Sequence, residues 1–251
     1  MGNYILQDLE MAGVQWELTE TPEIQNVKKA NIQQTFLDTL SNRQNENKPV
    51  IIPPSAPINL DTVKSMVERP NDIDSLLRMI GEFNHPLKSG ATNTVMPSIA
   101  KNPNGLMIIT DLPSSDDDLS GKILSGTPGE LTDKMLNAVN MSRENVSIIP
   151  LLFWRTPGGR TPSREELDLA RPFVDKIIEM LSPGIIITFG TLAASEIAKN
   201  NLSDVHGSEI SDENGRKIIP IYHPNYLILK PSAKRDVWSV LQNVEKMLKN
   251  T

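Results

Sequence analysis

Two segments far apart in the chain each place a titratable side chain directly after an apolar run. Leu106–Gly126 carries Asp111 just past such a run, and Lys217–Trp238 carries His223 in the same position. Each apolar run predicts a buried strand that ends in a polar, proline-containing loop. In open α/β sheets, ligands bind at the carboxyl ends of the strands. The sequence therefore predicts one site at which Asp111 and His223 face each other across a cleft.

Two loops beside these residues have a composition that suits ligand binding. The loop after Asp111 holds Pro113, three consecutive acids and two glycines, which would let a backbone approach a ligand. Residues 154–162, W-R-T-P-G-G-R-T-P, set Arg155 and Arg160 beside a Gly-Gly pair that could hold a phosphate. The alternatives are a solvated acidic loop in the first case and, in the second, a rigid loop whose arginines pair with nearby acids.

The segment Y-H-P-N-Y-L at residues 222–227 puts a proline directly after His223. An imidazole just outside a buried strand can donate a hydrogen bond to a developing anion. A single histidine can equally be structural. Leu227 and Ile228 predict an apolar wedge, of the kind that holds open the gap left by an extruded base.

The elements that must position these residues follow from the apolar pattern. Strands are predicted at residues 106–110, 146–153, 185–189 and 217–222. Helices are predicted at residues 74–83, 128–140, 163–181, 191–199 and 233–249, the third of them opening with the capping box Ser163–Glu166. Strand and helix alternate, so the predicted fold class is α/β, a three-layer α/β/α sandwich with a central, mostly parallel four-stranded sheet.

Residues 1–60 differ from the remainder in composition. Short amphipathic helices are predicted within residues 3–11 and 31–41, and the Asn- and Pro-rich stretch 41–61 reads as a linker. The predicted organisation is an N-terminal helical extension with a linker over 1–60, followed by one α/β domain over 61–251 that carries the candidate site.

Composition excludes several kinds of site. The chain has no cysteine, which excludes thiolate nucleophiles, zinc–thiolate sites and Cys-ligated iron–sulfur clusters. The three histidines, His85, His206 and His223, lack metal-ligand spacing, so no metal site is expected. The net charge of −6 argues against a general nucleic-acid scavenger, but residues 143–251 hold 14 basic against 13 acidic side chains, which permits a local basic face. No membrane-spanning stretch or secretory signal is present, so a cytoplasmic monomer is expected.

The loops taken together resemble the family-4 uracil-DNA glycosylases, the branch of that superfamily that carries an iron–sulfur cluster. The resemblance covers roughly residues 74–248. Its motifs here are T-D-L-P-S at 110–114, G-K-I-L-S-G at 121–126, R-T-P-G-G-R-T-P at 155–162, H-P-N at 223–225 and K-R-x-x-W at 234–238. The resemblance implies the uracil-DNA glycosylase fold, and an enzyme that flips a base out of DNA and breaks the bond between sugar and base.

The resemblance also assigns roles to single positions. Asp111 stands where the family has its catalytic glutamate, and His223 would stabilise the departing base. Contacts to the base are implied for Leu112, Pro113, Leu124 and Pro150. Contacts to DNA are implied for Arg160, Asn225, Lys234 and Arg235, and Leu227 joins them as the wedge.

The departures from the family pattern bear on activity. The cluster cysteines are missing, with His85 and Ala170 at two of their positions, so no cofactor is expected. Leu124 replaces the phenylalanine that stacks on uracil, and Pro150 replaces the asparagine that reads its edge. Both changes imply weak or altered activity.

Three hypotheses follow. The leading one is a uracil-DNA glycosylase-like enzyme that removes uracil or another deaminated base from DNA during base excision repair. The alternative is a catalytically degenerate protein of this fold that binds DNA or a protein partner. The third is an unrelated α/β enzyme acting on a small nucleotide or base.

Overall fold

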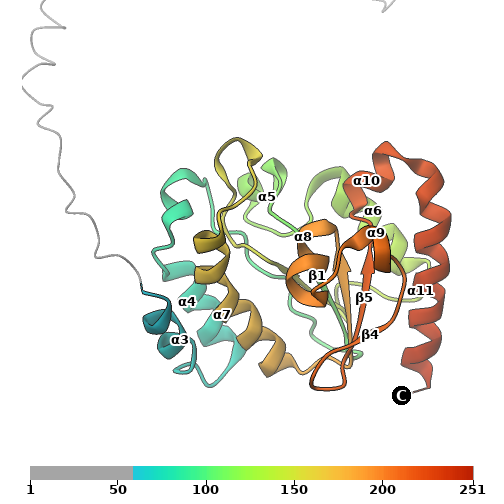
Figure 1. The fold of residues 1–251 in the computed structure, drawn as a ribbon, viewed down its shortest axis with the longest axis horizontal. Coiled ribbons are helices and arrows are strands. Elements are labelled where there is room, and N and C mark those ends of the chain that lie inside the picture. The colour runs from blue at the N-terminus through green and yellow to red at the C-terminus, as the bar shows by residue number, and fades with distance from the viewer. Residues whose placement is uncertain (1–58, 251) are drawn as a thin grey trace, which may run out of the picture. The chain divides into compact units, whose positions relative to one another are not determined.

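The computed structural model describes residues 59–250, which form an α/β domain around one five-stranded sheet (Figure 1). The strand order is β2-β1-β3-β5-β4. The first four strands in that order run parallel, and β4 is antiparallel to β5. The strands are β1 (Leu106–Thr110), β2 (Ser147–Pro150), β3 (Ile185–Phe189), β4 (Ile210–Ser211) and β5 (Lys217–Ile221).

The four parallel strands are the four that the sequence predicts. Nearly every residue in them is buried, because helices cover both faces of a parallel sheet. Ile108 of β1 lies opposite Ile148 of β2 and Ile187 of β3, which fixes the register at the centre of the sheet. The fifth strand, β4, was not predicted, because two residues carry no periodic pattern.

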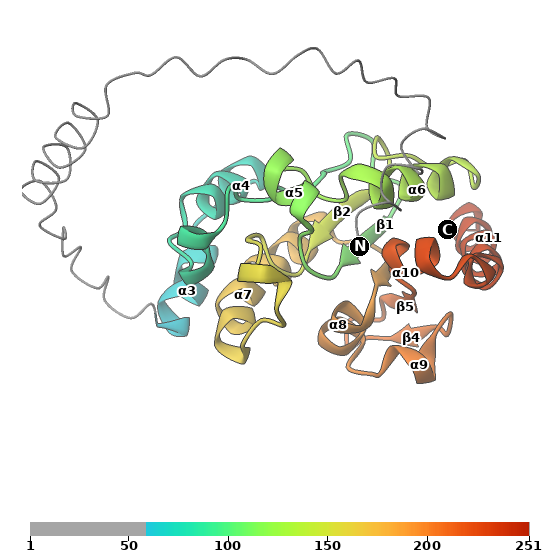
Figure 2. The same ribbon diagram turned by 90° about the horizontal axis from the view of Figure 1, so that it is seen from above.

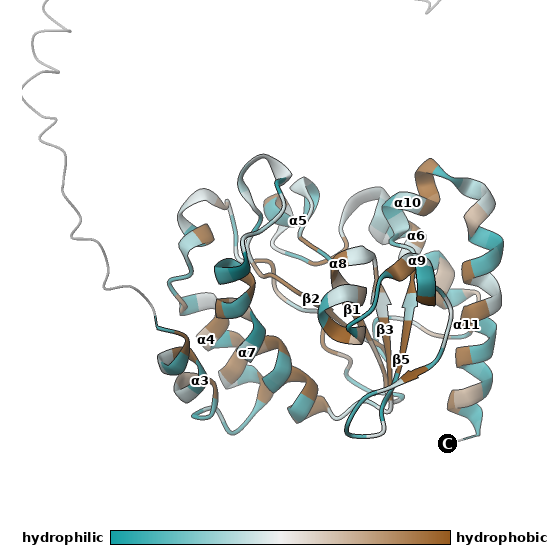
Figure 3. Ribbon diagram, viewed as in Figure 1, coloured by the Kyte–Doolittle hydropathy of each residue, from teal (hydrophilic) through white to brown (hydrophobic). Residues whose placement is uncertain are grey.

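Helices pack on both faces of the sheet, which confirms the three-layer arrangement (Figure 2). One face meets α3 (Leu60–Val67), α4 (Ile73–Glu82) and α7 (Arg164–Leu181). The other meets α6 (Gly126–Asn137), α10 (Pro224–Leu229) and α11 (Lys234–Lys249). The remaining helical segments are α5 (Ser115–Ser120), α8 (Thr191–Ala193), α9 (Leu202–Val205), the 3₁₀ turns Pro86–Gly90, Pro157–Gly159 and Pro231–Ala233, and the π-helical turn Ala194–Ala198. Figure 3 shows the apolar strands at the centre and helices whose apolar side faces them.

The acidic loop after Asp111 is largely a helix, which corrects its interpretation as a solvated loop. Ser114 and Asp117 form a capping box at the start of α5, and Gly121 ends the helix with a φ of 69°. Asp117 and Asp118 are buried, and their carboxylates accept backbone N–H groups of neighbouring loops. These two acids are therefore part of the framework that holds the loop in place.

The helix predicted at 191–199 is interrupted. After three α-helical residues, Ala194–Ala198 forms a π turn that ends at Lys199 with a φ of 58°. Such π turns are rare and occur often at functional sites. The predicted extension and linker over 1–60 lie outside the described residues, apart from positions 59 and 60. No helix among residues 59–250 is long and apolar enough to cross a membrane.

Candidate active site

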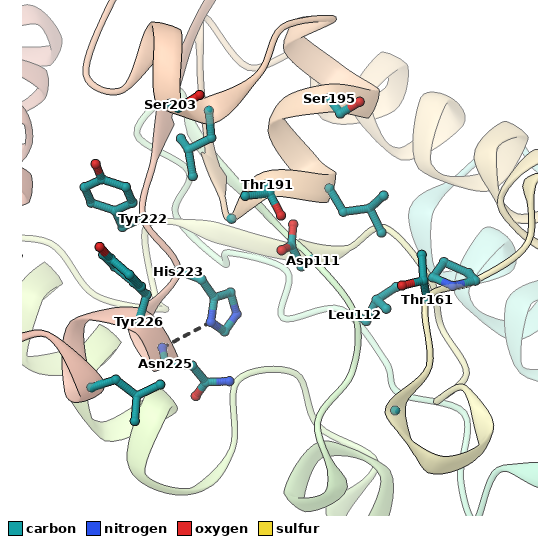
Figure 4. Close-up of a pocket in the computed structure, with 16 residues that line it drawn as sticks. Asp111, Leu112, Thr161, Thr191, Ser195, Ser203, Tyr222, His223, Asn225 and Tyr226 are labelled. Carbon is teal, nitrogen blue, oxygen red and sulfur yellow. Dashed lines mark hydrogen bonds between the residues drawn. The ribbon is translucent and has the colours of Figure 1, made fainter.

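A cavity of about 860 Å³ opens at the carboxyl ends of the parallel strands. Its walls come from the segments that follow β1, β3 and β5 and from the loop before α7. The lining residues are Asp111, Leu112, Gly159, Thr161, Pro162, Gly190, Thr191, Leu192, Ser195, Leu202, Ser203, Tyr222, His223, Asn225, Tyr226 and Leu229. Figure 4 shows Asp111 and His223 near the centre, with two tyrosines on one side and Leu112 and Thr161 on the other.

Asp111 and His223 therefore line the same cavity, as the sequence leads us to expect. Because parallel strands end at one edge of the sheet, β1 and β5 deliver residues 112 places apart to a common site. Among the lining residues of the described chain, Asp111 is the only acid and His223 the only imidazole. The chemical roles of the two side chains stay predictions.

The Asp111 carboxylate is held by the start of the helix that follows β3. Its Oδ1 accepts the backbone N–H of Ala193 at 2.6 Å, at the positive end of α8. Gly190 makes this approach possible. A Cβ added at Gly190 would overlap the carboxylate, and the φ of 102° there is one that other residues rarely adopt.

Burial decides the ionisation of Asp111. Removal of the carboxylate from water raises its pKa from 3.8 to about 6, although N–H groups of Ala193, Leu192 and Thr191 oppose the rise. The carboxylate is thus ionised at neutral pH but gains a proton in mild acid. A carboxylate of this kind can stabilise positive charge or orient a water molecule.

The His223 ring is fixed by hydrogen bonds at both nitrogens. Nδ1 accepts the backbone N–H of Asn225 at 3.1 Å, so the proton of the neutral ring is assigned to Nε2. Nε2 lies 3.0 Å from the Thr110 hydroxyl oxygen and donates to it. Burial lowers the pKa of His223 to about 4, which keeps the ring neutral at physiological pH. A neutral N–H donor is suited to a leaving group that acquires negative charge.

The residues predicted to contact the base divide into two groups. Leu112 lines the cavity beside Asp111. Pro113, Leu124 and Pro150 are buried and are absent from its lining. Leu124 packs in the core between the sheet, α6 and α11, with its carbonyl accepting a hydrogen bond from Arg143. The structure therefore gives no support to contacts of these three side chains with a base.

The two residues of the predicted wedge have different environments, since Leu227 is buried and Ile228 is 38% exposed. Leu227 is fully buried in the core beneath α10 and cannot enter DNA. The helix turns the next residues outward instead, so that Leu229 is 84% exposed and lines the cavity. Asn225 lies at the cavity with its side chain exposed, where contact with DNA is open to it.

Arg160 does not offer a free guanidinium to phosphate. It forms a two-pronged ion pair with Glu166, at 2.8 Å and 2.5 Å, and also donates to the Thr161 carbonyl. The pairing holds the pKa of Glu166 at about 2. The structural interpretation of this loop, in which an arginine pairs with a local acid, is the one observed.

Lys234 and Arg235 are exposed at the start of α11. They line a second, smaller groove of about 390 Å³ between α6 and α11, together with Trp238. The two cations are thus available to phosphates, but they lie outside the cavity that holds Asp111 and His223.

Several lining residues were missed at the level of sequence. They are Thr161, Thr191, Ser195, Leu202, Ser203, Tyr222 and Tyr226. Tyr222 and Tyr226 flank His223 in the Y-H-P-N-Y segment, so their proximity was a usable signal. Thr110 was also missed as the partner of His223, because a threonine at the end of a strand looks like any other strand residue.

The cluster position of the resembled family is filled by packed side chains. His85 is buried, stacks on Trp154 with ring centres 4.5 Å apart, and hydrogen-bonds the Glu166 carbonyl through Nε2. Ala170 is fully buried in the same core. The sequence supplies no thiolate, and no group of three or more His, Cys, Asp or Glu within residues 59–250 could hold a metal ion. These residues do not fit an iron–sulfur cluster.

Comparison with known proteins points to one family. A family model described as the uracil DNA glycosylase superfamily matches residues 97–243, a span that contains both Asp111 and His223. The chain is 30% identical over 165 residues to the type-4 uracil-DNA glycosylase of Thermotoga maritima, covering 64% of this chain and 84% of that protein. It is 28% identical over 167 residues to the type-4 enzyme of Archaeoglobus fulgidus, covering 62% and 82%.

Proposed function

Since this chain belongs to the uracil-DNA glycosylase superfamily, we propose that it removes uracil, or another deaminated base, from DNA by cleaving the bond between base and deoxyribose. The observation that carries the proposal is the presence of Asp111 and His223 in one cavity at the carboxyl edge of the sheet. Repair by base excision begins with this reaction, and DNA is the partner that it requires.

In the proposed reaction, the target base leaves the duplex and enters the cavity. As the bond to the sugar breaks, positive charge develops on the sugar and negative charge on the base. The ionised Asp111 carboxylate, fixed by the Ala193 N–H, stabilises the sugar cation or orients water toward it. The Nε2–H of His223 exchanges its Thr110 partner for an oxygen of the departing base.

Recognition of the base must rely on side chains other than those used in the resembled family. The positions of the stacking phenylalanine and the edge-reading asparagine hold Leu124 and Pro150, which are buried outside the cavity. Hydroxyl and amide groups on the wall, such as those of Thr191 and Asn225, are the available hydrogen-bonding partners. We therefore propose that the protein accepts another deaminated base in addition to uracil or in its place.

The test is release of free base from uracil-, hypoxanthine- and xanthine-containing DNA, single- and double-stranded. The parent chain should form abasic sites on at least one substrate, and both Asp111→Asn and His223→Gln should lose most of that activity. Lys217→Gln serves as the control, because Lys217 is partly exposed at the opposite, amino-terminal end of β5. Full activity in Asp111→Asn would remove the role assigned to the carboxylate.

A second candidate function has one observation in its favour. The Asp111 carboxylate accepts a backbone hydrogen bond at the start of α8. A side chain whose only role is to cap that helix would do the same. In that case the protein binds DNA or a protein partner without cleaving a base. Salt-dependent DNA binding with no base release from any of the three substrates would favour this alternative.

A further inference from the structure

Three aromatic rings stand in series, and two of them line one wall of the cavity. The rings of His206 and Tyr222 are stacked at 4.0 Å with an angle of 28°, and those of Tyr222 and Tyr226 lie 4.8 Å apart at 40°. Both tyrosines line the cavity beside His223, and Figure 4 shows them together on one side of it. We call Tyr222 and Tyr226 with His206 the aromatic stack.

The inner end of the aromatic stack is formed by His206 and Tyr222. His206 follows α9 and Tyr222 follows β5, so its inner rings come from two separate parts of the chain. Burial lowers the pKa of His206, and its Nε2 has no hydrogen-bond partner among the described residues. The imidazole ring packs flat against the ring of Tyr222 and supports it from the inner side.

The outer end of the stack is open. Tyr226 is 38% exposed, and the Lys230 ammonium lies 5.8 Å from the centre of its ring. Neither tyrosine hydroxyl has a hydrogen bond to another described residue. The packing of the stack thus uses the rings alone, and the exposed ring of Tyr226 is the part that is available to a ligand. The exposed lysine chain can move aside while its charge stays close.

An aromatic face with a cation beside it is the combination that binds single-stranded nucleic acid. The aromatic face stacks on a base of any identity, and the cation meets the backbone phosphate. The cavity volume of about 860 Å³ lies toward the upper end of the roughly 300–1,000 Å³ found for ligand pockets, which leaves space beyond a single pyrimidine ring.

We propose that the aromatic stack binds the base of an unpaired nucleotide next to the flipped one, with Lys230 on its phosphate. The inference rests on the proposed function, since the flipped nucleotide between Asp111 and His223 determines which base reaches Tyr226. A base stacked on Tyr226 has left its own duplex partner. Single-stranded DNA, in which no pairing must be broken, is therefore the preferred substrate class.

The experiment measures binding separately from catalysis. The full chain is titrated with a uracil-free single-stranded oligonucleotide, and with one that carries 2-aminopurine beside a tetrahydrofuran abasic-site analogue. Tyr226→Leu should weaken single-strand binding by about 5- to 150-fold and abolish quenching of the 2-aminopurine, whereas Tyr226→Phe should bind as the parent does. Lys230→Gln should reduce the salt dependence by about one phosphate contact.

Leu119→Ala is the control, because Leu119 is also an exposed apolar side chain but lies on α5 and lines neither the cavity nor the groove between α6 and α11. An equal loss in this control, or in Tyr226→Leu on fully paired duplex, would overturn the inference. So would unchanged affinity and quenching in Tyr226→Leu. Ring-dependent binding without base release from any substrate would defeat the proposed function and leave the stacking site standing.

Discussion

The substitution Asp111→Asn should make the protein more stable at neutral pH while it removes the proposed activity. Asparagine has the shape of aspartate, and its Oδ1 can still accept the Ala193 N–H. What the substitution removes is a negative charge that burial disfavours. The loss of charge can therefore be measured with little change in packing.

The pH dependence follows from the raised pKa of Asp111. In the folded chain, the Asp111 carboxyl group keeps its proton up to about pH 6, whereas in the unfolded chain it releases the proton near pH 3.8. The stability that the bound proton contributes is fully present below pH 3.8, the pKa of Asp111 in the unfolded chain. It is lost as the pH rises through about 6, the pKa in the folded chain. At 1.36 kcal/mol for each pH unit between 3.8 and 6, the ionised carboxylate costs at most about 3 kcal/mol. We expect a gain of about 1–3 kcal/mol for the asparagine variant at pH 7, and little gain near pH 4.

Urea unfolding of parent and variant at about pH 4, pH 5.5 and pH 7 measures this difference. Asp74→Asn is the matched control, since Asp74 is an exposed aspartate in the first turn of α4. The control should lack a gain that grows with pH. An Asp111→Asn variant whose advantage is the same at all three pH values, or absent, would refute the account of a buried charge.

Three further predictions concern the site and its supporting core. If ionised Asp111 is required, base release should fall to about one tenth of its plateau at pH 5, because the pKa is about 6, and a rate that is flat from pH 5 to pH 8 would contradict this. Leu229→Ala should weaken DNA binding in a fluorescence-anisotropy titration without loss of stability. Leu227→Ala should instead lower the free energy of unfolding by about 2–5 kcal/mol. The reverse pattern would restore Leu227 as the wedge. His85→Ala should destabilise the fold by about 2–4 kcal/mol, since it empties a stacked and hydrogen-bonded position, and dialysis of the parent against a chelator should leave its unfolding midpoint unchanged.

The sequence determined the framework of the fold because its signals are local. Four apolar runs are buried on both faces of the sheet, and the Ser163–Glu166 capping box starts α7 where the pattern indicates. The order of these elements, read with the rule that ligands bind at the carboxyl edge, was enough to bring Asp111 and His223 together. The missed elements include β4, α5, α9 and α10, each of six residues or fewer and so too short for periodicity to reveal, and the eight-residue α3 was missed as well.

The tertiary structure decided which side chains reach the cavity and in what state. Leu227 and Leu229 are equally apolar in sequence, but the turn of α10 buries one and exposes the other. The sequence shows that Arg160 carries a positive charge. The folded structure shows that this charge is paired with Glu166 and is therefore not free to bind a phosphate. The pKa of Asp111 depends on burial and on amides 80 to 82 positions away in the chain. Residue types and their order are written along the chain, whereas exposure, pairing and ionisation depend on neighbours that only folding brings together.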